Sequence, residues 1–392
     1  MEPNPETTPM YVCDPVLNKD KTISYTSYTL QGSRVPQPLV RRYRDFNALR
    51  SKLMERWPGV YIPNIPHKQL VGAKDKEVVE MRIEQINRFC LKISKIGYLF
   101  SSEEMENFLK NEADIPKLLS SMKQQTPEEL LRKYSNVFTS YDENFDTQAG
   151  KLDQEKFLKT LKDNFTRLKT FRKVVDQSKE KTKNMLEIYK SLFTEFNKFE
   201  TEFLNGLVNE DENKLVFGNK ENVEISQNIS DITSKNLNPF DKLSDSVNED
   251  FLDCEAMIEA FESLNSLQNT YDKMTKNFTS INTQLAELQA GKTNLKSLLS
   301  FKSKEETIAQ LNTDKEKLEK NIEHIGNVIK IAIFNMQNEI KIFKFNKLEN
   351  YYKELNDIEK DFENNVNSFD ILWDSILNSQ KIKNNNVRRR KY

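Results

Sequence analysis

Residues 41–46 read Arg-Arg-Tyr-Arg-Asp-Phe, and they lie where the pattern of the chain changes. Up to this point, residues 10–45 alternate apolar and polar side chains in short pieces separated by turn formers, a pattern typical of a small antiparallel sheet of two or three strands. Beyond it, residues 46–57 have helical spacing, and residues 76–96 and 102–110 predict two more helices. Strands followed by helices predict an α+β domain.

The composition favours long helices for the rest of the chain. Of its 392 residues, 30% are charged and 37% are hydrophobic, a mixture that long amphipathic helices accommodate better than a large conventional globule. Eleven of the 12 prolines lie at or before residue 127, and Pro239 stands alone in the remaining 265 residues. Because a proline inside a helix costs about 3 kcal/mol, we expect this remainder to be almost entirely helical.

A first helix boundary is marked by Thr126-Pro127-Glu128-Glu129. A capping threonine, a proline at the first helical position and a glutamate three residues after the cap predict that a helix begins here. This helix is apolar on one side, and we assign it to a linker, residues 118–150.

Three longer segments follow, in which apolar residues recur at steps of three and four. They run over about 151–208, 239–299 and 304–378, and each would extend roughly 85–110 Å as a helix. One chain cannot bury all the apolar faces of such helices, so we expect a dimer. Residues 1–9 are expected to form an amino-terminal tail and residues 379–392 a disordered basic tail.

Several classes of function are disfavoured. The net charge of -1 argues against bulk nucleic-acid binding. The three cysteines, Cys13, Cys90 and Cys254, are odd in number and far apart, which fits a reducing, cytoplasmic location.

Neither histidine has a partner at zinc-ligand spacing, so we expect no metal and no cofactor. No signal-peptide pattern and no apolar run long enough for a membrane span is present, so we expect a protein that is neither secreted nor membrane-spanning. Without a nucleotide-binding loop or a nucleophile signature, we expect no catalytic residues and no enzyme.

The basic run at residues 41–46 is the candidate binding site. Guanidinium groups offer planar forks of donors that suit a phosphate, and a neighbouring aromatic ring can stack on a flat polar ligand. Taken alone, the run is more typical of a solvated strand edge.

The surrounding sequence favours the binding interpretation, because it resembles the phox-homology (PX) domain of the sorting nexins. The hallmark of that domain is a basic pair, an aromatic residue, one variable residue and then Asp-Phe. The likeness also covers Val12-Cys13-Asp14-Pro15, Tyr25-Thr26-Ser27-Tyr28, the proline-bearing loop at 63–72 and Arg82 seven residues before Phe89. Two residues depart from the pattern: Arg44 replaces a small polar residue, and Asn64 replaces a frequent proline. The resemblance places a PX domain at residues 10–117, with Phe46 and Trp57 expected in its core.

The resemblance also implies roles for single residues. Arg42 would bind the 3-phosphate of phosphatidylinositol 3-phosphate, and Tyr43 would stack on its inositol ring. Lys68 would contact the 1-phosphate, and Arg82 would contact the ring hydroxyls at positions 4 and 5. Further along the same loop, Leu70 and Val71 would dip into the bilayer.

The three long segments resemble the BAR domain that follows PX in one branch of the sorting nexins. This likeness predicts a three-helix coiled coil over residues 151–378. Residues 151–208 hold 13 Lys and Arg against 9 Asp and Glu, and Lys169, Arg172 and Lys173 are candidates for contact with an anionic membrane. The alternative for these lysines and arginines is an ordinary solvated helix face.

Taken together, the resemblance implies a peripheral protein on the cytosolic face of early endosomes. A homodimer, or a heterodimer with another PX-BAR sorting nexin, would bring two headgroup sites, two amphipathic helices and a basic face to one membrane, and would sense or generate curvature during cargo sorting into recycling or retrograde carriers. Cargo or coat subunits are possible partners. Two alternatives remain open: an autophagy-related PX-BAR protein, and a coiled-coil tether that uses PX only as a membrane address.

Overall fold

The computed structural model describes most of the chain, namely residues 7–19, 24–65, 76–204, 238–290 and 304–389. The chain forms two compact units. The first unit combines Met1–Asp163 with Leu252–Phe343, and the second unit combines Asn164–Phe251 with Lys344–Tyr392.

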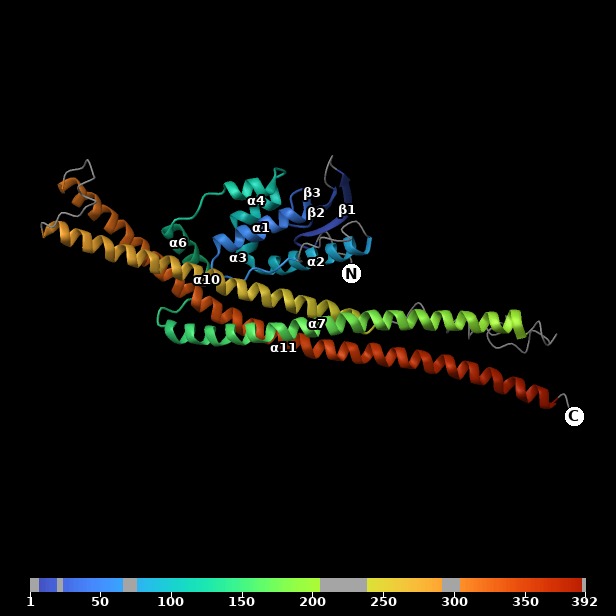
Figure 1. Cartoon of the computed structure of the whole chain (residues 1–392). Coiled ribbons are helices and arrows are strands. Elements are labelled where there is room, and N and C mark those ends of the chain that lie inside the picture. Colours follow the sequence, from blue (N-terminus) through green and yellow to red (C-terminus); the bar gives the residue numbers. More distant parts are fainter. Residues whose placement is uncertain (1–6, 20–23, 66–75, 205–237, 291–303, 390–392) are drawn as a thin grey trace. The chain divides into compact units, whose positions relative to one another are not determined.

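The chain begins with the predicted antiparallel sheet, which has three strands in the order β1-β2-β3. The strands are β1 (Tyr11–Lys19), β2 (Ser24–Gln31) and β3 (Leu39–Arg42). Residue Ser27 of β2 pairs with Arg42 of β3, so the basic run begins inside the sheet. Figure 1 shows α1 and α2 beside these strands.

Five helices complete the amino-terminal domain: α1 (Tyr43–Arg56), α2 (Lys76–Lys95), α3 (Gly97–Phe100), α4 (Glu103–Lys110) and α5 (Ile115–Ser121). The first of them starts three residues before its predicted start. The reason is local, because the Asp45 carboxylate accepts a hydrogen bond of 2.8 Å from the Arg42 backbone N–H at the helix start. Phe46 and Trp57 are both buried in the core, as predicted. The predicted α+β class is confirmed.

The linker helix α6 (Pro127–Val137) carries the predicted capping box. Thr126 Oγ1 accepts from the Glu129 backbone N–H at 3.2 Å, and Glu129 returns the contact to the Thr126 N–H at 2.8 Å. Its apolar residues Tyr134 and Phe138 are buried, and the Tyr134 ring lies 6.1 Å from that of Trp57. The expectation that this amphipathic helix meets the membrane is therefore wrong for this structure, because its apolar side packs inside the first unit.

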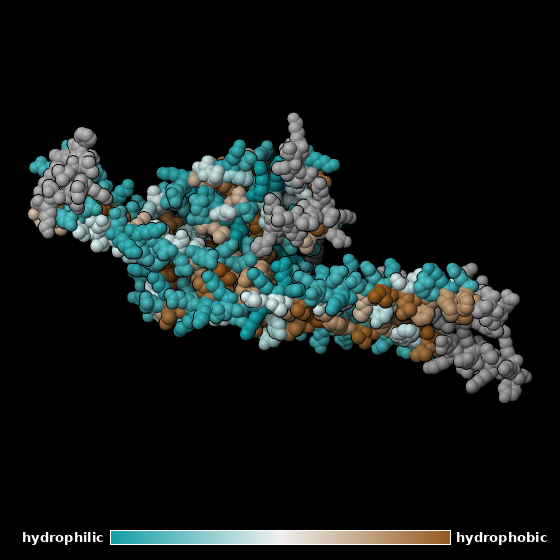
Figure 2. All heavy atoms as spheres, in the orientation of Figure 1, coloured by the Kyte–Doolittle hydropathy of each residue, from teal (hydrophilic) through white to brown (hydrophobic). Residues whose placement is uncertain are grey.

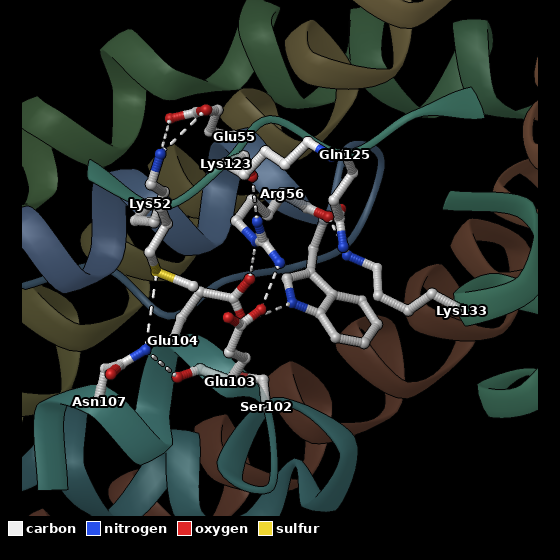
Figure 3. Close-up of polar contacts among 12 residues, drawn as sticks. Lys52, Glu55, Arg56, Ser102, Glu103, Glu104, Asn107, Lys123, Gln125 and Lys133 are labelled. Carbon is white, nitrogen blue, oxygen red and sulfur yellow. Dashed lines mark hydrogen bonds and ion pairs between the residues drawn. The ribbon is translucent and has the colours of Figure 1, made fainter. Parts of the chain in front are cut away.

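A polar network accompanies the apolar packing of α6 (Figure 3). The buried Arg56 donates to Glu103 at 2.7 Å and also to Glu104. Lys133 of α6 donates to Gln125 at 2.8 Å, and its ammonium lies 3.9 Å from the centre of the Trp57 ring. Burial lowers the pKa of Lys133 to about 7.

After residue 146, the described residues of the chain are almost entirely helical, which confirms the predicted all-α class of this part. It consists of α7 (Thr147–Lys198), a π-helical turn at Phe199–Leu204, α10 (Phe240–Gln289) and α11 (Lys304–Arg389). α7 begins four residues before the predicted residue 151, because the Asp146 carboxylate accepts from the Gln148 and Ala149 backbone N–H groups. α11 continues to Arg389, so the segment expected to be a disordered tail after residue 378 is largely helical; it contains no proline or glycine up to that point.

The core of the first unit is shared between the amino-terminal domain and the long helices. Leu264 of α10 and Val328 and Ala332 of α11 are buried in the same cluster as Phe46. Gly59 marks the closest approach: its φ is +77°, and an added Cβ would lie 3.2 Å from atoms of both Leu264 and Ala332. A side chain at Gly59 would strain the backbone and crowd this contact.

Candidate functional site

The two arginines at the end of β3 have different environments because neighbouring residues of a strand face opposite sides. Arg41 is buried, and its guanidinium donates at 2.6 Å to the carbonyl oxygens of both Phe108 and Asn111. It also lies over the Phe108 ring, 5.1 Å from the ring centre. Arg41 is thus a structural residue that fastens β3 to α4.

Arg42, the residue predicted to bind phosphate, is held by an aromatic side chain of the neighbouring strand. Its guanidinium carbon lies 3.5 Å from the centre of the Tyr25 ring, and its Nη2 donates to the Tyr25 hydroxyl at 2.6 Å. Its backbone N–H is held by Asp45. Arg42 is therefore fixed at both its main chain and its side chain.

Tyr43 and Arg82 come together although they lie on different helices. The Arg82 guanidinium of α2 lies 5.8 Å from the centre of the Tyr43 ring of α1, within the range of a cation–π contact. Burial raises the pKa of Tyr43, and Arg82 and Arg50 oppose this shift. We call Tyr25, Arg42, Tyr43 and Arg82 the Arg42 cluster.

The hydroxyl of Tyr28 lies beside this cluster. Burial raises the pKa of Tyr28, and the nearby Arg82 opposes the shift. The Tyr28 hydroxyl is buried beside the Arg82 guanidinium, whose charge and hydrogen bond both oppose the shift. A buried hydroxyl next to a guanidinium suits a ligand rich in oxygen atoms.

Arg44, which departs from the PX pattern, interacts with residues outside the Arg42 cluster. It pairs with Asp114 at 3.1 Å, and its side chain is 54% exposed. An exposed ion pair of this kind contributes little to stability. Lys68, Leu70 and Val71, the other predicted contacts of this site, lie outside the described residues.

The predicted basic contacts Lys169, Arg172 and Lys173 lie on α7 in the second unit. Together with Lys181, Asp176 and Glu180 they border a surface hollow of about 700 Å³. The rings of Phe165 and Phe251 are stacked 4.7 Å apart, and the cations of Lys169 and Arg172 lie about 5 Å from one or the other of them.

Three other lysines of the long helices are already paired with carboxylates. Lys162 lies 3.5 Å from Glu262, Lys179 lies 3.0 Å from Asp241, and Lys347 forms an ion pair with Asp250. Because each of these three ammonium groups already has a carboxylate partner, it is less available to bind an anionic membrane.

Tyr25 is the residue of the site whose role the sequence interpretation missed. The pattern predicted the strand but not its register. Because Ser27 faces Arg42 across the sheet, Tyr25 occupies the diagonal position on the same face, within reach of a long side chain. A predicted register would have revealed the contact.

The described part of the chain contains neither a membrane-spanning helix nor a metal-ligand cluster. None of its helices combines the length and the uninterrupted apolar character that crossing a bilayer requires. Nor do three His, Cys, Asp or Glu side chains gather there as a metal site would need.

Comparison with known proteins finds a family match for the amino-terminal part of the chain and a fold match for almost the whole chain. Residues 32–112 match the family model "PX domain". The chain is 36% identical over 122 residues to vacuolar protein sorting-associated protein vps5 of Schizosaccharomyces pombe, covering 28% of this chain and 21% of that protein. It is 33% identical over 108 residues to sorting nexin 1 of Arabidopsis thaliana, covering 25% of this chain and 27% of that protein. The chain thus matches less than a third of the length of either relative.

The fold comparison extends over almost the whole chain. The cryo-EM structure of the SNX-BAR Mvp1 tetramer aligns with 94% of this chain and 100% of its own, with a TM-score of 0.56 and 14% identity. At this identity the likeness establishes the fold alone.

Proposed function

A PX domain followed by the fold of an SNX-BAR protein makes this chain a PX-BAR sorting nexin, and from that premise we propose that it binds phosphatidylinositol 3-phosphate on early endosomes and dimerises to sense or generate membrane curvature. The observation that carries the proposal is the Arg42 cluster. It brings together two guanidinium groups and two aromatic rings from four separate elements, as two arginine–tyrosine pairs that meet at the consecutive residues Arg42 and Tyr43.

The chemistry of each residue fits a phosphorylated inositol. Arg42 offers a fixed fork to the 3-phosphate, a dianion for which a guanidinium is well suited. Tyr43 supplies an aromatic face for the sugar ring, and Arg82 offers a second fork to the hydroxyls at positions 4 and 5. Lys68 is assigned to the 1-phosphate by the resemblance.

The second unit supports dimerisation. Apolar side chains gather on α7 and α11 in this unit (Figure 2), and Ile188 is 66% and Phe345 63% exposed. Leaving so many apolar side chains in water is unfavourable, at about 25 cal/mol per Å² of apolar surface. We call the exposed apolar side chains of this unit, which include Val174, Ile188, Phe345, Leu348, Val366 and Ile371, its apolar face. We assign it to a second copy of this chain or to a related PX-BAR protein.

A dimer would present two headgroup sites and two copies of the Lys169, Arg172 and Lys173 group to one membrane. Individually weak contacts add through effective concentration when they engage the same surface. Binding would then require both the marked lipid and a membrane shape that lets all sites engage. Cargo sorting by such dimers follows from this selectivity.

Vesicle sedimentation tests the proposal. The full chain is incubated with vesicles that contain phosphatidylinositol 3-phosphate, another phosphoinositide or neither, at two diameters. We expect Arg42→Ala to lose about tenfold to a hundredfold in affinity for the marked vesicles, the range of lost hydrogen bonds to a charged group. The matched control is Arg44→Ala, which removes the same charge two residues away and is expected to change little. An unchanged lipid preference in Arg42→Ala would refute the site.

Electron microscopy of the same vesicles tests the second half of the proposal. The wild-type dimer is expected to form tubules from marked vesicles. Binding without deformation would favour the coiled-coil tether over curvature generation.

A further inference from the structure

A segment of the amino-terminal domain without regular secondary structure, residues 59–65, forms polar contacts with helix α10 within the first unit. The Gly59 N–H donates to Ser263 Oγ at 2.8 Å, and Asn64 Nδ2 donates to Glu255 Oε2 at 3.1 Å. Between them, Glu259 forms an ion pair with Arg50. Glu255, Glu259 and Ser263 are spaced four residues apart, so they lie on one face of α10. We call these three residues the α10 stripe.

The central contact of the α10 stripe reaches the backbone of the segment through Arg50. This arginine is buried, and its Nε donates to the Pro63 carbonyl at 2.9 Å while the other side of its fork meets Glu259. A buried guanidinium needs such partners, because it loses its hydration shell. Glu259 thereby orients Arg50, and Arg50 fixes the chain at Pro63.

Asn64, one of the two departures from the PX pattern, makes the second contact. Its Nδ2 reaches Glu255, and its Oδ1 accepts from the Ile65 N–H at 2.9 Å. A proline at this position has no side-chain amide and could make neither contact. In this chain, asparagine therefore ties the segment to the long helix.

Two further contacts hold the domain near the same end of α10. Asp253 accepts from the Tyr61 hydroxyl at 2.8 Å and from Lys92 at 2.7 Å. The domain is thus held by several polar contacts in addition to the shared apolar core, which limits its freedom to shift along the helix.

The fastened segment is linked to the proposed lipid site through α1. Arg50, which the α10 stripe orients, follows Tyr43 by seven residues on this helix, about two turns, so the two side chains lie on the same face. A displacement of residues 59–65 would therefore move Arg50 and, through α1, disturb the Tyr43 side of the proposed lipid site.

We propose that the α10 stripe is a positioning element for phosphoinositide binding, so that the headgroup affinity of the PX domain depends on its contacts with the long helix. The inference rests on the proposed function and deepens it. It makes Asn64, Glu255 and Glu259 positioning residues that do not themselves touch the lipid.

The test reverses one hydrogen bond and measures binding of soluble inositol 1,3-bisphosphate to the full chain by calorimetry. This probe reports on the headgroup site without contributions from membrane avidity. Asn64→Asp sets two carboxylates against each other, and Glu255→Gln removes the charge of the acceptor. In the double variant the glutamine amide donates to the aspartate, so the contact returns with its direction reversed.

We expect each single variant to weaken headgroup binding about fivefold and the double variant to return to within about twofold of wild type, in the usual range of coupling between sites. A general electrostatic effect predicts the opposite for Glu255→Gln, because removing a negative charge would strengthen the binding of an anion. The matched control is Glu262→Gln, which makes the same charge change on α10 at a residue that faces Lys162. Its affinity is expected to equal that of wild type.

Thermal unfolding of all variants accompanies the binding measurements. A purely structural role would lower the unfolding temperature while leaving the headgroup affinity of the folded protein unchanged, and that result would overturn the inference. So would a double variant no better than Asn64→Asp, or tighter binding by Glu255→Gln. Absence of headgroup binding by wild type would overturn the proposed function and the inference with it, whereas equal binding by wild type and every variant would overturn the inference alone.

Discussion

The guanidinium of Arg42 lies over the ring of Tyr25, with its carbon 3.5 Å from the ring centre and its Nη2 2.6 Å from the phenol oxygen. The two residues belong to adjacent strands, and the register that pairs Ser27 with Arg42 brings them together. Because Tyr25 accepts a hydrogen bond from Arg42, its own O–H remains able to donate to a ligand. Tyr25 thus holds the proposed phosphate-binding arginine and adds a donor beside it.

The first prediction concerns this contact. Tyr25→Ala removes both the stacking surface and the hydroxyl, and it is expected to weaken binding to vesicles with phosphatidylinositol 3-phosphate by about tenfold. Tyr25→Phe keeps the ring and is expected to lose only about threefold. Thr26→Ala, on the opposite face of the same strand, is the control. Equal binding by Tyr25→Ala and wild type in sedimentation would remove Tyr25 from the site.

Arg41 and Arg42 are expected to have different roles. Arg41 is expected to stabilise the fold, and Arg42 to bind the lipid. Arg41→Ala leaves the carbonyls of Phe108 and Asn111 without their donors and is predicted to cost about 2–4 kcal/mol of unfolding free energy. Arg42→Ala is predicted to change the unfolding free energy by less than about 1 kcal/mol while removing lipid preference. Urea unfolding at one fixed protein concentration measures both. A larger loss of stability in Arg42→Ala than in Arg41→Ala would contradict these roles.

A pH dependence is expected from Glu339 of α11. Burial raises the pKa of its carboxyl from 4.5 to about 7. The folded chain therefore binds this proton more tightly than the unfolded chain, and the stabilisation that protonation provides is lost as the pH rises from about 4.5 through about 7.

Glu339→Gln removes this dependence. Relative to wild type, its unfolding free energy is predicted to increase between pH 5 and pH 8 and to change no further above that. Urea unfolding at these values measures the difference. A difference between the two proteins that stays constant over this range would contradict the raised pKa.

The last prediction concerns the apolar face of the second unit. Phe345→Asp places a charge where we propose that a second copy packs, and it is expected to shift the dimer toward monomer by at least about tenfold in dissociation constant. The adjacent exposed residue provides a matched control, because Asn346→Asp adds the same charge. Analytical ultracentrifugation compares the two. Equal association would place the dimer interface elsewhere.

The helical caps and the order of elements were predictable because they depend on neighbours in sequence. The box formed by Thr126 and Glu129 was predicted and is confirmed, since both partners lie within one helical turn. The early starts of α1 and α7 were missed. In both cases an aspartate, Asp45 or Asp146, supplies a capping carboxylate that the apolar periodicity does not reveal.

By itself, the sequence determined that this chain has an α+β domain followed by long helices, because strand alternation, helical periodicity and proline avoidance are local properties of the backbone. Its resemblance to the PX domain singled out Arg42, Tyr43 and Arg82. Only the tertiary structure decided which partners these residues meet. In the tertiary structure Arg41 is buried, whereas Arg42 contacts Tyr25. Asn64 forms a hydrogen bond with a glutamate that lies 191 residues further along the chain. The tertiary structure also buried the apolar side of α6 that had suggested a membrane contact. Such pairings depend on strand register and on the approach of distant elements, and both are set by the packing of the whole first unit.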